Sequence, residues 1–438
     1  MTTYIPGAVR LYGPEFANDP QAVYAMLRQQ FGRVAPVEIT PGIYSHLVID
    51  YRAALDVTTN SGEIWSKDPR AWQATLPDTD AARGLMGMIG YRPNCLFSDG
   101  QAHQRYRRVI SDCFAMIPPY RMRALVTEYA DRLIREFAGT GRADLVGQYA
   151  RLITLHLFNR LFGRPDADSA ALTASLNGLV DASPEQGEAA TAKFGQYMSE
   201  LLHSKYQQPG DDFTTWLLHH PAALDHDEAL HELTLTVGAG NEPLVNLITN
   251  SISRWLTNAR FAASLTDGAL SIQYVLQEVL REEPSMANYG PYFVTRPVEF
   301  HGRWIRPAEL VLVSYAAANT APAVRPDGPR SDTGAHLAFG AGDHRCPAAD
   351  PALLIAATAI ERILTLLPGL RLAVPREELV WRHGPFHRSL AELPVTFTPV
   401  RPDQPGETPW TSSSPSPSTP SAATSPANAP ACAWPATS

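Results

Sequence analysis

The chain has 438 residues, of which 45% are hydrophobic and 18% are charged, and its formal net charge is −8. A chain of this length can bury a large apolar core, and the acidic balance, with a pI near 5.9, argues against nucleic acid as a partner. The cysteines (Cys95, Cys113, Cys346, Cys432) show no paired spacing, which fits a reducing cytoplasm better than a secreted fold. Because the sequence has no run of about 18 apolar residues, we expect a cytoplasmic protein without a membrane anchor.

In chain order, the first elements that the sequence predicts are a helix over 20–30 and a strand over 44–49. The segment 65–94 follows, and it contains several prolines and glycines. This composition predicts a long irregular loop of the kind that often forms one wall of a binding site.

The longest predicted helix covers 225–257 and contains a proline in its middle. Pro243 lies just after Gly240, and a proline inside a helix removes one backbone hydrogen bond and kinks the rod. The kink could serve packing alone, or it could form a groove lined by freed carbonyl groups beside a cofactor. Asn241 and Glu242 would then be the polar groups of that groove.

The second half of the chain predicts a helix over 271–283 and strands over 298–305. Glu278 and Arg281 share one face of this helix, and His301-Gly302 predicts a turn between two strands. Residues 1–400 are expected to form one domain. Residues 401–438 are rich in proline, serine, threonine and alanine, which predicts a disordered tail.

A cysteine closes the glycine-bearing segment Phe339–Cys346, directly before an apolar helical pattern. The backbone amides at a helix start favour a thiolate, and Gly340 and Gly342 let the backbone approach a flat cofactor. His344 could reach an anionic group at the edge of that cofactor. The segment is therefore suited to bind haem iron through Cys346, although a single buried cysteine can also be purely structural.

Five segments together resemble ordered motifs of the cytochrome P450 family, in particular its soluble actinobacterial class. They are 99–107, 277–281, 310–319, 326–330 and 339–346, and the similarity spans about 13–400. The resemblance implies a mainly α fold with small β-sheets, a helical prism around haem b. It also implies that Glu278 and Arg281 form a structural network that Arg330 closes.

The resemblance also implies the residues of a haem site. Cys346 would be the axial ligand of the iron, and His103, Arg107 and His344 would contact the haem propionates. Phe339 and Gly240 would lie against the cofactor. Where the family often has a further propionate-binding arginine, this chain has Tyr292, and Arg296, four residues later, is the candidate replacement.

The main departure from the family lies in the predicted central helix. The family usually has a threonine after the acidic residue, and that threonine helps to deliver protons to dioxygen. Here Glu242 is followed by Pro243, which has neither a hydroxyl nor an N–H group. We therefore expect Asn241, Glu242 and Pro243 to define the catalytic side, with Glu242 and ordered water moving protons.

These features predict a monooxygenase that oxidises a small apolar organic substrate, of the secondary-metabolite type, with dioxygen. Electrons would come from a separate ferredoxin and ferredoxin reductase, since the chain has no reductase domain. Arg105, Arg108 and Arg345 are the candidates for docking an acidic ferredoxin. Two alternatives remain open: a peroxide-driven or radical-coupling P450, and a haem-bound signalling or interaction protein with little catalysis. A zinc hydrolase is set aside because no zinc-binding spacing occurs.

Overall fold

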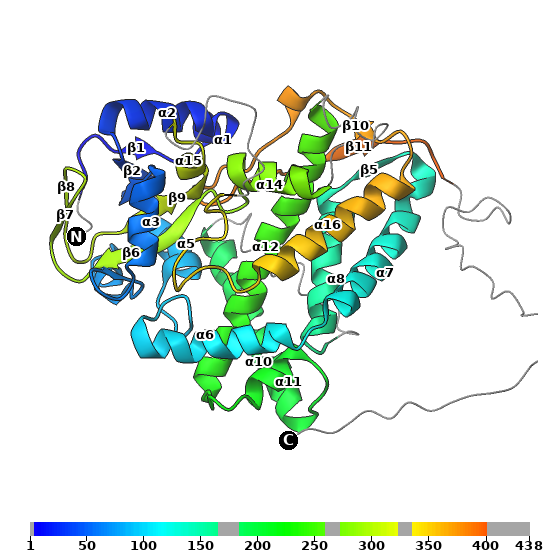
Figure 1. The fold of residues 1–438 in the computed structure, drawn as a ribbon, viewed down its shortest axis with the longest axis horizontal. Helices are drawn as coiled ribbons and strands as arrows, with labels where there is room; N and C mark the ends of the chain where they lie inside the picture. Colours follow the sequence, from blue (N-terminus) through cyan, green and yellow to red (C-terminus); the bar gives the residue numbers. More distant parts are fainter. Residues whose placement is uncertain (1–3, 165–183, 259–271, 323–334, 401–438) are drawn as a thin grey trace, which may run out of the picture. The chain divides into compact units, whose positions relative to one another are not determined.

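The computed structural model describes residues 4–164, 184–258, 272–322 and 335–400, and they are mainly helical with small sheets, as predicted (Figure 1). The principal helices are α1 (Pro14–Asn18), α2 (Pro20–Phe31), α3 (Tyr51–Thr59), α4 (Arg70–Gln73), α5 (Asp80–Ile89), α6 (Gly100–Ala115), α7 (Pro119–Phe137), α8 (Arg151–Leu161), α10 (Pro184–Gln207), α11 (Phe213–Leu218), α12 (His226–Thr257), α14 (Ile272–Glu282), α15 (Tyr315–Asn319) and α16 (Ala349–Leu366). No helix in these ranges is both long and apolar enough to cross a membrane.

The strands of the described residues form three sheets, of six, three and two strands. They are β1 (Val9–Arg10), β2 (Val34–Thr40), β3 (Ile43–Val48), β4 (Trp65–Ser66), β5 (Arg142–Asp144), β6 (Asn288–Val294), β7 (Val298–Phe300), β8 (Arg303–Ile305), β9 (Val311–Ser314), β10 (Arg371–Leu372) and β11 (Pro394–Thr396). The largest sheet has the order β1-β2-β3-β9-β6-β4, a second has the order β10-β11-β5, and β7 pairs with β8.

Several local predictions are confirmed. Helix α2 begins at Pro20 after the cap Asp19, whose carboxylate accepts the Ala22 N–H, and β3 covers most of the predicted first strand. The turn between β7 and β8 places His301 and Gly302 at positive φ, the backbone conformation that a tight hairpin needs.

The prediction of an irregular loop over 65–94 is wrong. This segment contains β4, α4 and the ten-residue helix α5. The hydroxyl of Thr79 accepts the Ala82 N–H and caps α5. The proline at 77 lies before this cap, where it does not interrupt the helix, so the proline content of the segment was misleading.

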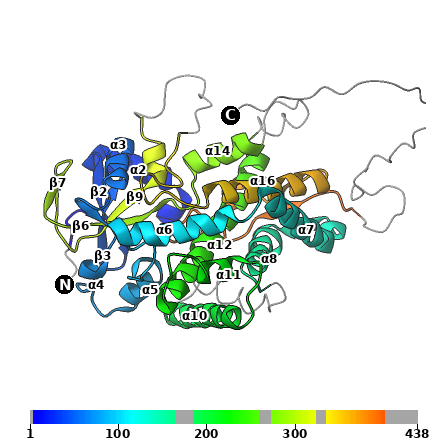
Figure 2. The same ribbon diagram turned by 60° about the horizontal axis from the view of Figure 1, so that its bottom comes forward.

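Helix α12 is the central element of the helical region, and it packs against α8, α10, α14 and α16 (Figures 1 and 2). Asp225 and Glu228 form a reciprocal capping box at its start. The helix continues to Thr257 with Pro243 inside it, as predicted. The 401–438 tail and Arg330 lie outside the described residues.

Candidate functional site

The segment Phe339–Cys346 folds as a tight loop that leads into α16. The Cys346 N–H donates to the Phe339 carbonyl at 2.8 Å, and the Arg345 N–H donates to the Gly342 carbonyl at 3.0 Å. Gly340 and Gly342 have φ of 70° and 67°. A Cβ on Gly342 would lie 2.2 Å from the Thr58 carbonyl oxygen, so glycine is required there.

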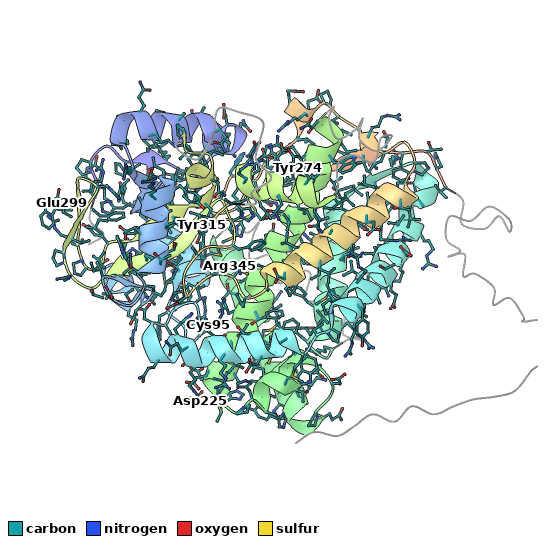
Figure 3. All side chains as sticks on the ribbon, viewed as in Figure 1. Cys95, Asp225, Tyr274, Glu299, Tyr315 and Arg345 are labelled. Atoms are coloured by element: carbon teal, nitrogen blue, oxygen red, sulfur yellow. The ribbon has the colours of Figure 1, made fainter. Side chains whose placement is uncertain are left out.

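Cys346 is the described cysteine with the most favourable surroundings for a thiolate. Burial raises its thiol pKa, while a backbone N–H at Ala348 and the guanidinium groups of Arg107 and Arg345 act in the opposite direction. Figure 3 shows Arg345 beside the start of α16. The surroundings therefore already contain the donors and the positive charge that a thiolate ligand needs.

The other described cysteines lack this environment. Cys95 lies next to α6 (Figure 3), and burial together with the carboxylate of Glu232 raises its thiol pKa well above the usual value. Burial and the Asp112 carboxylate raise the thiol pKa of Cys113 to about 12. Both thiols are therefore poor candidates for a metal-binding thiolate.

Three of the predicted propionate contacts meet beside the cysteine loop. The rings of His103 and His344 lie 3.9 Å apart, centroid to centroid, although the two residues are far apart in the sequence. His103 Nδ1 is 2.8 Å from the Cys95 carbonyl oxygen, which holds the ring in place. Arg107, one turn further along α6, donates to the Arg345 carbonyl oxygen.

Asp99, at the N-cap of α6, connects this cluster to the strand region. Its carboxylate accepts the Ser66 hydroxyl at 2.6 Å and the Lys67 N–H at 2.9 Å, and it lies 3.8 Å from His344 Nε2. These contacts outweigh burial and lower the pKa of Asp99 to about 2. Burial lowers the pKa of His344 to about 4, so its ring is neutral at pH 7.

On α12, the predicted catalytic residues divide between two environments. Ala239 is exposed and Gly240 and Pro243 are partly exposed, although α12 passes through the middle of the helical region. Glu242 is buried; its Oε1 lies 3.1 Å from the Ser389 hydroxyl and 3.7 Å from Arg382 Nη1. Asn241 is also buried, and its side-chain oxygen is without a hydrogen-bond partner within the described residues.

Gly240 and Arg296 were predicted to contact the cofactor, and the structure shows different neighbours for each. A Cβ on Gly240 would lie 2.9 Å from the ring of Phe158, so the glycine permits close packing against α8. Arg296 is exposed in the turn after β6, because that strand ends at Val294. Within the described residues no hydrogen bond or ion pair joins Arg296 to either histidine, so its part in binding the cofactor stays a prediction.

One of the arginines predicted to dock a ferredoxin, Arg105, is already paired with a carboxylate. Arg105 does not present free positive charge, because its guanidinium binds both carboxylate oxygens of Glu228 at 2.7 and 2.9 Å. Arg108 is exposed and pairs with Asp112, and Arg345 is exposed. Sequence analysis also did not predict that Lys67 is buried near the site, because its polar neighbours are typical of a surface segment.

Comparison with known proteins identifies the family. No family model matches the chain, but it is 32% identical over 396 residues to the cytochrome P450 monooxygenase PikC of Streptomyces venezuelae, covering 88% of this chain and 92% of PikC. This chain belongs to the cytochrome P450 family. It is also 30% identical to the vitamin D(3) 25-hydroxylase of Pseudonocardia autotrophica, covering 76% of this chain and 85% of that enzyme. Among solved structures, CYP154A1 of Streptomyces coelicolor matches with a TM-score of 0.78 and 26% identity over 89% of this chain and all of that one.

The protein is therefore a cytochrome P450 monooxygenase, and its cofactor is haem b. The described residues fit this group in three respects. A cysteine with N–H and guanidinium neighbours lies at the start of α16. His103, His344 and the Arg107 guanidinium converge beside it and could bind propionates, and α12 carries the exposed small residue Ala239.

Proposed function

We propose that Cys346 is the axial haem ligand of this P450 and that residues 1–400 form its haem domain. The observation that carries the proposal is the meeting of the Cys346 loop, which contains His344, with His103 and Arg107 of α6. His103, His344 and Arg107 would bind the propionates, and Phe339, at the base of the loop, would pack against the ring. When bound, the haem supplies the activation of dioxygen that oxidises a substrate C–H bond.

Proton delivery in this P450 depends on the chain's own polar groups beside α12. Pro243 offers no hydroxyl, but Ser389 places one 3.1 Å from the Glu242 carboxylate and 2.8 Å from the side-chain oxygen of Asn246. We propose that Glu242 holds the proton and that Ser389 takes over part of the role of the missing threonine hydroxyl. Asn241 would order water near the same carboxylate, and Pro243 would shape the helix.

The substrate is proposed to be a small apolar organic molecule of the secondary-metabolite type. Between Leu233 and Asn241 the helix carries no charged side chain, and the exposed position in this stretch is an alanine. The names of related P450s agree with such chemistry: one is a mycinamicin IV hydroxylase/epoxidase and another a biflaviolin synthase.

A ferredoxin with its reductase is the proposed electron source. Of the arginines considered for docking, Arg108 and Arg345 are exposed, and Arg345 adjoins the cysteine itself. A protein docked there would lie beside the proposed haem ligand. An acidic ferredoxin matches this charge.

The absence of a threonine at position 243 supports one alternative, a peroxide-driven reaction that needs less proton delivery. Purified holoprotein should be incubated with a candidate substrate panel, NAD(P)H, a ferredoxin, its reductase and isotopically labelled dioxygen. The proposal predicts products that carry one labelled oxygen atom and form only when the ferredoxin is present. Products formed with peroxide but with no ferredoxin system would favour the alternative.

A further inference from the structure

Lys67 is a lysine whose ammonium group lies inside the protein. The residue follows β4, and only 2% of its surface is exposed. Its Nζ donates to the Pro291 carbonyl oxygen at 3.1 Å and lies 3.5 Å from the ring centroid of Tyr292. An ammonium group has three N–H donors, and the Pro291 carbonyl is the acceptor that the described residues provide.

This buried charge has no carboxylate in contact with it in the described ranges. The nearby anion, Asp99, is already bound by the Ser66 hydroxyl, the Ser61 hydroxyl and the Lys67 backbone N–H. Burial lowers the pKa of Lys67 to about 7, and Asp99 only partly opposes this effect. A buried cation is costly unless an anion pairs with it, so the site is suited to receive one.

Lys67 lies next to the residues predicted to contact the haem propionates. Strand β4 pairs with β6 through Trp65–Val294 and Ser66–Phe293, so Lys67 comes next in register opposite Tyr292. The Asp99 carboxylate, which accepts the Lys67 backbone N–H at 2.9 Å, lies 3.8 Å from His344 Nε2. The ammonium group therefore adjoins the same cluster that receives the propionates in the proposed haem site.

We propose that Lys67 binds one haem propionate through a buried, charge-assisted hydrogen bond. From its position just after β4, Lys67 supplies the positive charge that Tyr292 of β6 cannot supply. This inference rests on the proposed haem site and names a residue of that site that the sequence motifs did not include. Because the pair is buried, it also raises the reduction potential of the haem, since a nearby positive charge favours the added electron.

Two neutral variants test the charge separately from packing. Lys67→Met keeps the length of the side chain, and Lys67→Gln keeps an N–H donor for the Pro291 carbonyl. The matched control is Arg296→Ala, which removes the exposed arginine just after β6. Haem transfer from each ferric holoprotein to excess apomyoglobin gives the rate of haem loss, and dye-coupled titration gives the reduction potential.

Both Lys67 variants should lose haem about tenfold faster or more, as expected for a lost hydrogen bond between charged groups, and their potentials should become more negative. Arg296→Ala should match the wild type, and Tyr292→Arg combined with Lys67→Met should restore both values in part. If one neutral variant does not fold, the other decides. A folded neutral variant with wild-type haem loss and potential overturns this inference alone, whereas a wild-type chain that takes up no haem overturns the proposed function as well.

Discussion

Glu232 should make the stability of the protein depend on pH around neutrality. The residue lies on α12 and is completely buried. Its Oε1 accepts the Cys95 N–H at 2.6 Å, and its Oε2 is without a partner within the described residues. Burial raises the carboxyl pKa from 4.5 to about 7; the N–H and the thiol of Cys95 and the charge of Arg107 oppose this shift, and Glu228 acts in the same direction as burial.

The sign follows from proton binding. Between pH 4.5 and 7 the folded chain holds a proton on Glu232 that the unfolded chain has lost, so stability falls as the pH rises through 7. The shift corresponds to a loss of about 2 to 3 kcal/mol between pH 5 and pH 8. Glu232→Gln keeps an acceptor for the Cys95 N–H but cannot titrate, so it should remove this part of the pH dependence.

Urea unfolding of the wild type and Glu232→Gln at pH 5, 6, 7 and 8 measures the effect. The difference in unfolding free energy between the two proteins should change by about 2 to 3 kcal/mol in favour of the variant as the pH rises. Glu228→Gln is the control on the same helix: the bond from Arg105 lowers the pKa of Glu228 to about 2, so its titration lies below this range. A difference between wild type and Glu232→Gln that stays constant from pH 5 to 8 would refute the reasoning.

Two further predictions concern the cysteine loop and the helix α12. Gly342→Ala should lower the unfolding free energy by about 3 kcal/mol, because the new Cβ meets the Thr58 carbonyl and the residue has a positive φ. The control is Gly302→Ala, which also has a positive φ but has open space around the new Cβ, so it should lower the unfolding free energy by only about 1 kcal/mol. Equal losses for the two variants in urea unfolding would contradict this prediction. Ser389→Ala should lower dioxygen-driven product formation at least about tenfold while peroxide-driven turnover stays unchanged, and Pro243→Thr in the same chain should restore part of the loss. Unchanged product yield per NAD(P)H in Ser389→Ala would exclude the proposed proton role.

Local signals in the sequence predicted much of the fold. The start of α2 after its cap Asp19 and the His301-Gly302 turn depend on neighbouring residues alone, so a short segment of sequence is enough to predict them. The prediction of a loop over 65–94 was wrong because the structure of this segment depends on contacts with distant residues. Its prolines lie outside the helices, and apolar contacts with the sheet region help to hold α5: Leu85 and Ile89 belong to the same buried cluster as Phe293.

The site was predicted less completely because burial of charge depends on distant elements. Lys67 follows a serine and precedes an aspartate, a run typical of a surface, and only the pairing of β4 with β6 buries it. Arg105 lies in the same motif as His103 and Arg107, but Glu228 of α12, more than a hundred residues away, binds its guanidinium. Arg296 has the right spacing from Tyr292, but β6 ends before reaching it.

The central claim, ligation by Cys346, is tested most directly by the spectrum of the ferrous protein under carbon monoxide. Wild type, Cys346→Ser, Cys95→Ser and Cys113→Ser should be compared as purified, haem-loaded proteins. The account predicts a red-shifted Soret band, the signature of a thiolate ligand, in the wild type and in the Cys95 and Cys113 variants, and its loss in Cys346→Ser. A Cys346→Ser protein that keeps this band, or a Cys95→Ser protein that loses it, would contradict the account.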